Sequence, residues 1–170
     1  MTSASIKTYA YGLADVKAYL FVSLFVIGNL LLPQACHLLP QGGMVWLPIY
    51  FFTLIAAYKY GLSVGLLTAT LSPLANHFLF GMPTAGMLPI ILVKSILLAI
   101  AASVVSKKSG IVSLSAILMV ILCYQFVGTL IEWAIVQDFR VAVQDFRIGI
   151  PGMLFQLFAG YGLLKLIAKR

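Results

Sequence analysis

The chain has 170 residues, of which 62% are hydrophobic and 9% are charged, and its mean hydropathy is +1.09. A soluble domain carries about a quarter charged residues, so this composition excludes an ordinary soluble protein. The apolar runs are continuous rather than alternating, which favours membrane-spanning helices. The net charge of +7 does not indicate a nucleic-acid partner, because the cations gather at the ends of apolar segments, where the positive-inside rule places them.

The pattern predicts an all-α integral membrane protein that forms a single six-helix domain over residues 1–170. The expected transmembrane helices cover residues 16–32, 44–58, 62–80, 89–106, 111–136 and 151–168. Asp15 is placed to cap the first helix, Pro33 to end it and Pro73 to kink the third. No cleavable signal peptide is expected, because the first apolar run starts late and is long enough to span the bilayer.

The placement of the lysines predicts the orientation in the membrane. With six spans, most cations fall on the side of the two termini: Lys7, Lys17, Lys59, Lys107, Lys108, Lys165, Lys169 and Arg170. The opposite side holds two arginines beside two aspartates: Arg140 and Arg147, with Asp138 and Asp145. The positive-inside rule therefore predicts cytoplasmic termini and outward-facing loops at 33–43, 81–88 and 137–150.

Lys94 is the most informative residue, because a lysine inside an apolar span costs several kcal/mol and usually faces a cavity or a partner. Counted from Met87 at about 1.5 Å per residue, Lys94 lies roughly 10 Å below the outer edge. The other candidate binding residues also fall in the outer half of the spans: Trp46, Tyr50, Asn76, His77, Gln125, Glu132, Trp133 and Gln156. The inner half is almost purely apolar, which predicts an outward-facing pocket rather than a pore.

Lys94 and Glu132 are the only charges inside the predicted spans, and they have two interpretations. They form a buried ion pair between two helices, because an unpaired buried charge is costly. Alternatively they flank a cavity, where Lys94 meets a carboxylate or phosphate and Glu132 meets ring N–H groups or a cation. Both interpretations hold if a ligand exchanges for the pair.

The other candidates also have structural alternatives. Gln125, Gly128 and Glu132 share one helical face, where the glycine leaves room either for a ligand or for close helix packing. The two tryptophans stack a flat heterocycle or belong to the aromatic belt at the membrane interface. Asn76 and His77 bind a ligand or cap the end of their helix.

Two outer loops carry further features. Cys36 and His37 are neighbours, but a metal site needs three or four ligands, so no metal is predicted. The sequence VQDFR occurs at 136–140 and again at 143–147. An offset of seven would place both copies on one helical face. The segment is therefore either an amphipathic lid with internal Asp–Arg pairs or a solvated linker.

The sequence contains no HExxH, GxSxG, Walker A or paired-aspartate protease motif, so it is not expected to be an enzyme or to hydrolyse ATP. Its layout, together with PQGGMVWLPIYFFTLIAAYKYGLSVGLL at Pro40–Leu67 and LSPLANHFLFGMP at Leu71–Pro83, resembles the substrate-binding (S) components of energy-coupling factor (ECF) vitamin transporters. The resemblance covers most of the chain. Ala14-x-x-x-Ala18 resembles the small-residue motif by which the first helix of an S component contacts the transmembrane coupling subunit.

The resemblance implies a subunit of a bacterial or archaeal plasma membrane that captures a vitamin-like micronutrient with high affinity. It implies that outer loops, here carrying Cys36, His37 and Met82, close over the ligand. The subunit would then dock on a coupling subunit with two ATPases, which hydrolyse the ATP, so this chain needs no cofactor. Thiamine-like compounds, queuosine precursors or other purine-like bases, carboxylate vitamins and corrinoids all stay open as ligands.

Three other functions stay open beside the S-component reading. The first is a self-sufficient small transporter, which needs a polar route through the inner half. The second is an intramembrane enzyme that uses His77, Lys94 and Glu132 as acid and base. The third is a structural assembly subunit, in which Lys94 and Glu132 serve only stability.

Overall fold

The computed structural model describes residues 4–5, 9 and 11–168 of the chain. Lys7, Lys169 and Arg170, which contribute to the predicted orientation, lie outside the described residues. The protein is an all-α, multi-pass membrane protein. Its described part contains five helices long and apolar enough to cross a bilayer: α1 (Val16–His37), α4 (Leu62–Phe80), α5 (Leu88–Ser109), α6 (Leu114–Val136) and α9 (Ile150–Ala168). The shorter elements are β1 (Ala4–Ser5), α2 (Gly42–Trp46), η1 (Pro48–Tyr50), α3 (Phe51–Tyr60), β2 (Ile111–Val112), α7 (Phe139–Ala142) and α8 (Gln144–Ile148).

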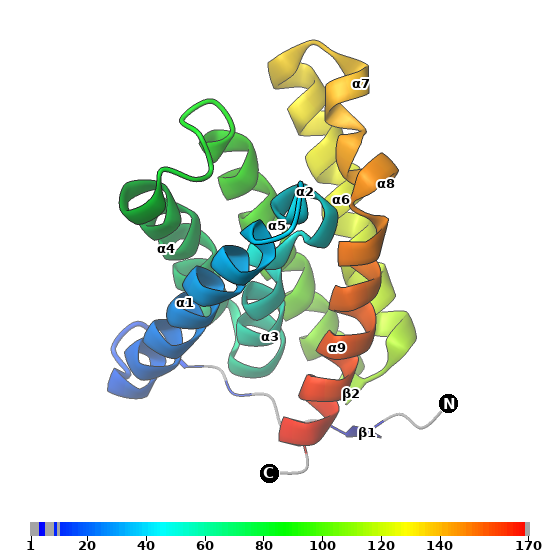
Figure 1. Cartoon of the computed structure of the whole chain (residues 1–170). Helices are drawn as coiled ribbons and strands as arrows, with labels where there is room; N and C mark the ends of the chain where they lie inside the picture. The colour runs from blue at the N-terminus through cyan, green and yellow to red at the C-terminus, as the bar shows by residue number, and fades with distance from the viewer. Residues whose placement is uncertain (1–3, 6–8, 10, 169–170) are drawn as a thin grey trace.

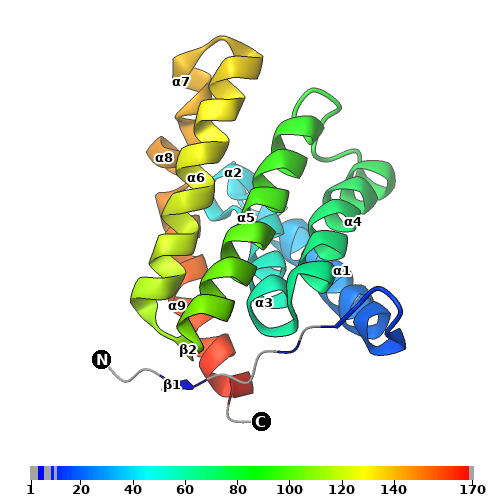
Figure 2. The same ribbon diagram turned by 180° about the vertical axis from the view of Figure 1, so that it is seen from behind.

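The long helices surround the short helix α3, which lies at the centre of the bundle (Figure 1). Helix α1 crosses one face, and α6 and α9 run side by side along one edge. From behind, α5 lies between α4 and α6 (Figure 2). We call the end that carries segments 81–87 and 137–149 the loop end. The opposite, terminal end carries the antiparallel pair β1–β2 and the last turn of α9.

The predicted continuous helix over 44–58 is wrong, because the helical conformation is interrupted at Leu47. This residue has the left-handed conformation φ 46°, ψ 46°, and it separates α2 from η1 and α3. Pro48 explains the break, since a proline disfavours the helical conformation of the residue before it. Gly152 of α9 packs against this point, where an added Cβ would lie 2.4 Å from the Trp46 carbonyl. The chain thus returns toward the terminal end through α2, η1 and α3, and the described residues form five long unbroken helices instead of the predicted six.

The prediction that the first helix ends at Pro33 is also wrong, since α1 continues to His37. A proline inside a helix leaves the carbonyl four residues earlier without its usual N–H donor. Here that carbonyl belongs to Asn29, and the Asn76 side chain of α4 donates to it at 2.8 Å. Helix α1 passes through the proline because a neighbouring helix supplies the missing hydrogen bond.

The remaining helices follow the sequence pattern closely. Helix α4 has the predicted bounds, α5 extends its predicted helix by a few residues, and α9 begins one residue earlier than predicted. The predicted helix over 111–136 begins later, because β2 comes first and Ser113 then caps α6 by accepting from the Ala116 N–H at 3.1 Å. The predicted polar loop after α6 contains the two short helices α7 and α8.

Candidate functional site

Lys94 lies inside the bundle with two carboxylates around its ammonium group. Its Nζ atom is 2.5 Å from Glu132 Oε2 on α6 and 2.6 Å from Asp145 Oδ2 on α8. The side chains of Lys94 and Glu132 are 2% and 5% exposed, whereas that of Asp145 is 20% exposed. We call these three residues the charge triad. With all three groups ionised, one ammonium faces two carboxylates, so the triad carries a formal charge of −1.

Gly128 explains how a lysine fits between two closely packed helices. It lies on α6 one turn before Glu132, and a Cβ at this position would be 2.7 Å from Lys94 Cγ. The space that the glycine leaves is therefore filled by the lysine stem. Of the two roles considered for Gly128, room for a ligand or close packing, the structure shows close packing. The group that packs against the glycine is the Lys94 side chain.

The two VQDFR copies have different roles. Asp138 of the first copy caps α7 by accepting from the N–H groups of Arg140 and Val141 at 2.8 and 3.4 Å. Asp145 of the second copy reaches Lys94 at 2.6 Å. The chain leaves the helical path at Val143 between α7 and α8, so the copies do not share one helical face.

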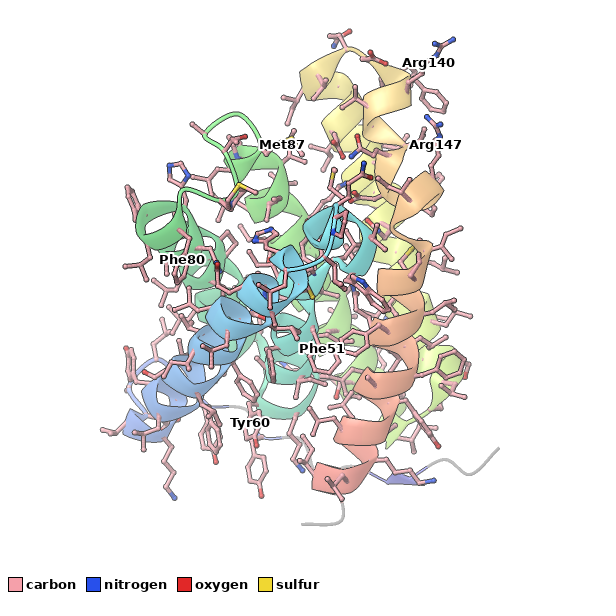
Figure 3. All side chains as sticks on the ribbon, viewed as in Figure 1. Phe51, Tyr60, Phe80, Met87, Arg140 and Arg147 are labelled. Carbon is pink, nitrogen blue, oxygen red and sulfur yellow. The ribbon has the colours of Figure 1, made fainter. Side chains whose placement is uncertain are left out.

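The two arginines of this repeat take no part in the charge triad. Among the described residues, neither Asp138 nor Asp145 forms an ion pair with an arginine. Arg140 and Arg147 are exposed and point away from the bundle (Figure 3). The segment is thus neither a lid with internal Asp–Arg pairs nor a solvated linker. It is folded into the short helices α7 and α8, and Asp145 attaches α8 to α5 and lines the smaller cavity.

Two adjoining cavities lie at the loop end, and the smaller of them borders the charge triad. The smaller measures about 70 Å³ and is lined by all three triad residues and by Tyr50. The larger measures about 190 Å³ and shares four of its wall residues with the smaller: Gly43, Ile49, Met87 and Ile91. The rest of its wall is mostly apolar: Pro33, His37, Pro48, Asn76, Met82, Pro83 and Thr84.

A network of neutral polar side chains supports the larger cavity. The Asn29 amide donates to Thr53 Oγ1 and Ser72 Oγ, both at 3.1 Å, and all of these groups are buried. Asn76, in the cavity wall, donates from Nδ2 to the carbonyls of Asn29 and Ser72 at 2.8 and 2.9 Å. Its Oδ1 is buried and accepts no hydrogen bond from the described part of the chain.

The structure brings some of the predicted site residues together. Tyr50, Lys94 and Glu132 surround the smaller cavity, and Asn76, His37 and Met82 line the larger one. Both interpretations of the lysine stay compatible with this geometry, because Lys94 and Glu132 are paired and also border a cavity.

Other predicted residues lie elsewhere. His77 donates from Nδ1 to the Pro83 carbonyl at 2.7 Å, and Cys36 is half-buried near the end of α1. Gln125 and Gln156 are fully buried, and the Gln156 carbonyl oxygen accepts from Tyr124 at 3.1 Å. None of these four predicted residues belongs to the walls of the two cavities as the described residues form them.

The two tryptophans do not form a stacking pair. Trp46 packs edge-on against Phe155, with ring centroids 6.2 Å apart. Trp133 is 47% exposed and packs against Phe139 at 5.6 Å. Neither indole is part of the cavity walls formed by the described residues. The exposed position of Trp133 at the loop end fits the alternative of an interfacial aromatic belt.

The coupling-subunit contact that the resemblance implies for Ala14 and Ala18 stays a prediction. Ala14 precedes α1, and Ala18 inside α1 is fully buried within this chain. The two alanines therefore do not share an exposed helical face.

Sequence reasoning missed Asp145, which it left in an outer loop. The signal that was available is the repeat itself, since the second copy places an aspartate seven residues after the first. Met87 and Ile91, which join the two cavities, were also missed because apolar wall residues carry no pattern of their own. No protein-family model, no curated protein and no solved structure matches this chain.

Proposed function

We propose that this chain is the ligand-capturing subunit of a membrane importer, of the kind that the S components of ECF transporters represent. The observation that supports this proposal most is the charge triad beside two adjoining cavities at one end of the bundle. Ligand sites of small molecules are mostly apolar concavities with a few convergent polar groups, and this end of the molecule has that character.

The proposed orientation places the loop end outside and the terminal end in the cytoplasm. The broken segment α2–η1–α3 counts as the sixth crossing, which leaves the start of α1 and the end of α9 on one side. The described lysines outside the charge triad lie near that terminal end: Lys17, Lys59, Lys107, Lys108 and Lys165. The positive-inside rule then makes this end cytoplasmic and opens the cavities toward the outside.

In the proposed mechanism, the cover formed by α7 and α8 opens and closes over the cavities, together with segment 81–87. Release on the inner side requires work that this chain has no motif to supply. A transmembrane coupling subunit with two ATPases would supply it, and a bacterial or archaeal plasma membrane is the setting that this proposal implies. The cargo is a small micronutrient whose apolar body fits beside the charge triad.

Identification of a co-purified small molecule tests this proposal. The protein is purified in mild detergent and denatured, and the extract is analysed by mass spectrometry. Parallel samples carry Lys94→Ala or Glu132→Ala, and Lys108→Ala serves as an exposed lysine control. We expect one compound in a near-stoichiometric amount in the wild type and the control, and its loss from both triad variants.

Two results contradict the proposal. One is an empty wild-type protein whose triad variants differ from it in stability alone, which indicates a structural charge cluster. The other is uptake by liposomes that contain this chain and no ATPase, which indicates a self-sufficient transporter.

A further inference from the structure

We propose that the ligand of this site is an organic cation with N–H donors and that Asp145 is its counter-ion. This inference rests on the proposed ligand-capturing function and names the chemical class of the cargo. It distinguishes among the ligand classes that the sequence leaves open. A cationic ligand would be attracted by the excess carboxylate of the charge triad, and a carboxylate ligand would be repelled by it.

The first observation is that one lysine lies between two carboxyl groups, which gives a formal charge of −1 when all three groups are ionised. Lys94 faces Glu132 and Asp145 at 2.5 and 2.6 Å, so its ammonium group is already occupied by two carboxylates. An anionic ligand would have to displace one of them and would add a second excess negative charge to a buried site. A monovalent cation would instead bring the site to neutrality, and buried charges are stable only when they are paired.

No other cation compensates the excess within the described structure. The nearest arginines in sequence, Arg140 and Arg147, are exposed and point away from the bundle (Figure 3). The other titratable side chains in the cavity walls are His37 and Tyr50. His37 is exposed, so solvent screens it, and the Tyr50 hydroxyl carries no positive charge in any protonation state.

The hydrogen-bonding capacity of the walls is the second observation. Asn76 Oδ1 is buried, has no donor among the described residues and belongs to a residue of the larger cavity wall. Its orientation is fixed, because Nδ2 donates to two carbonyl oxygens that an amide oxygen cannot replace. Asn76 thus holds an amide acceptor without a donor next to the larger cavity, and a donating ligand reaches it only if the wall shifts to expose this oxygen.

Asp145 is the carboxylate that the ligand meets, because it is the more exposed and the more movable of the two. It is 20% exposed and lies on the five-residue helix α8, whereas Glu132 is 5% exposed on the 23-residue helix α6. If Asp145 turns to the ligand, Lys94 keeps Glu132 as its partner. The exchange therefore leaves no lysine unpaired in the bundle.

The other wall residues indicate the shape and polarity of the uncharged part of the ligand. Ile49, Met87 and Ile91 line both cavities, and Tyr50 lines the smaller cavity beside the charge triad. A tyrosine ring attracts a cation placed over its face, and the methionine adapts to flat aromatic groups. These walls suit a small aromatic or heteroaromatic ring that carries an amidine-like or ammonium group.

Three probes of nearly equal size and shape test whether the site prefers a cation. They are benzamidinium, benzamide and benzoate, which carry charges of +1, 0 and −1. Their dissociation constants are measured calorimetrically with the detergent-purified, ligand-free full chain at pH 7. We expect benzamidinium to bind about tenfold or more tightly than benzamide, and benzoate to bind most weakly. Benzoate binding as tightly as benzamidinium, or more tightly, would overturn the inference while leaving the proposed pocket intact.

The matched variants are Asp145→Asn and Asp138→Asn, which change the same residue type in the two VQDFR copies. We expect Asp145→Asn to abolish the preference for benzamidinium over benzamide, and Asp138→Asn to retain it. An unchanged preference in Asp145→Asn would overturn the role of this residue. Failure of all three probes to bind the wild type would count against the charge assignment and the ligand-capturing function together. The wild-type order of affinities decides the charge even if a variant does not fold.

Discussion

Asp145 Oδ2 lies 2.6 Å from Lys94 Nζ across 51 residues of sequence, so one hydrogen bond attaches α8, a part of the proposed cover, to a buried residue of α5. The lysine end of this contact is buried, whereas the aspartate end is partly exposed. The proposed opening of the loop end requires this contact to break, and the partly exposed aspartate is the end that solvent can reach.

Asp145→Asn is expected to loosen the α7–α8 segment while the long helices stay folded. The neutral amide loses the charge-assisted bond, and such bonds are roughly twice as strong as neutral ones. Hydrogen exchange followed by mass spectrometry should show faster exchange at 138–148 and unchanged exchange in α5. Asp138→Asn is the control, because asparagine also caps helices well. Equal acceleration in both variants would show that Asp145 does not hold the cover.

Lys94→Met is expected to be strongly destabilising, because it leaves two carboxylates near each other without a cation. Breaking a buried ion pair from one side typically costs about 3–5 kcal/mol. The double variant Lys94→Met/Glu132→Gln should recover part of this loss, since one carboxylate is then neutral. The midpoint of thermal unfolding in detergent measures both effects. A double variant no more stable than Lys94→Met would contradict the electrostatic origin of the loss.

Gly128→Ala should destabilise the protein, although alanine favours a helix over glycine by up to about 1 kcal/mol. The new Cβ would lie 2.7 Å from Lys94 Cγ, near the root of a buried side chain. Overpacking of this kind costs about 1–3 kcal/mol, which outweighs the gain in helix propensity. Gly162→Ala on α9 is the matched control, because its Cβ would meet nothing within 4 Å. We expect the control to keep or raise the unfolding temperature.

Asn76→Leu and Pro33→Ala should show thermodynamic coupling. Asn76 donates to the Asn29 carbonyl that Pro33 leaves without a backbone donor. With alanine at position 33, its own N–H satisfies that carbonyl, so the loss of the Asn76 amide should cost less. A double-mutant cycle of unfolding midpoints should give a coupling of about 0.5–3 kcal/mol. Strict additivity would show that the two residues do not share this hydrogen bond.

Labelling with a membrane-impermeant maleimide tests the proposed orientation. Cys36 and Cys123 are first replaced by serine, and a single cysteine is then introduced at Gly86 or at Lys108, both of which are exposed. In intact cells we expect Gly86→Cys to react and Lys108→Cys to react only after lysis. The reverse pattern would invert the orientation and place the cavities on the cytoplasmic side.

The fold was largely predictable because apolar runs and lysine-rich turns mark helices in a membrane protein. Helix α4 has its predicted bounds, and the other long helices differ by only a few residues at most ends. The two larger errors both concern prolines. Proline usually ends a helix because it lacks an N–H donor. At Pro33 the helix continues, because the Asn76 side chain of α4 donates to the carbonyl that the proline leaves unpaired. The sequence pattern predicts a continuous helix through Pro48, but this proline interrupts the helix at Leu47.

The site residues that the sequence predicted best are the charged ones within apolar runs. Lys94 and Glu132 are conspicuous inside apolar runs, and the structure places them in contact. Asp145 lies in a polar stretch in which an aspartate is ordinary, so only the tertiary fold shows that it completes the charge triad. The sequence left two interpretations open for the tryptophans, since indoles are also common at the membrane interface. Neither indole lines the two cavities formed by the described residues.

The short length of α3 restricts how the molecule can move. Its ten residues span about 15 Å, half the hydrocarbon thickness of a bilayer. The rest of the proposed sixth crossing consists of α2, η1 and the left-handed Leu47 that interrupts the helix between them. Irregular backbone at this depth must stay covered by protein, because lipid cannot satisfy its peptide groups. Helices α1 and α9 contact α2, so separating them would expose this backbone to lipid. We therefore expect any rearrangement of the protein in the membrane to keep α1 and α9 in contact with α2.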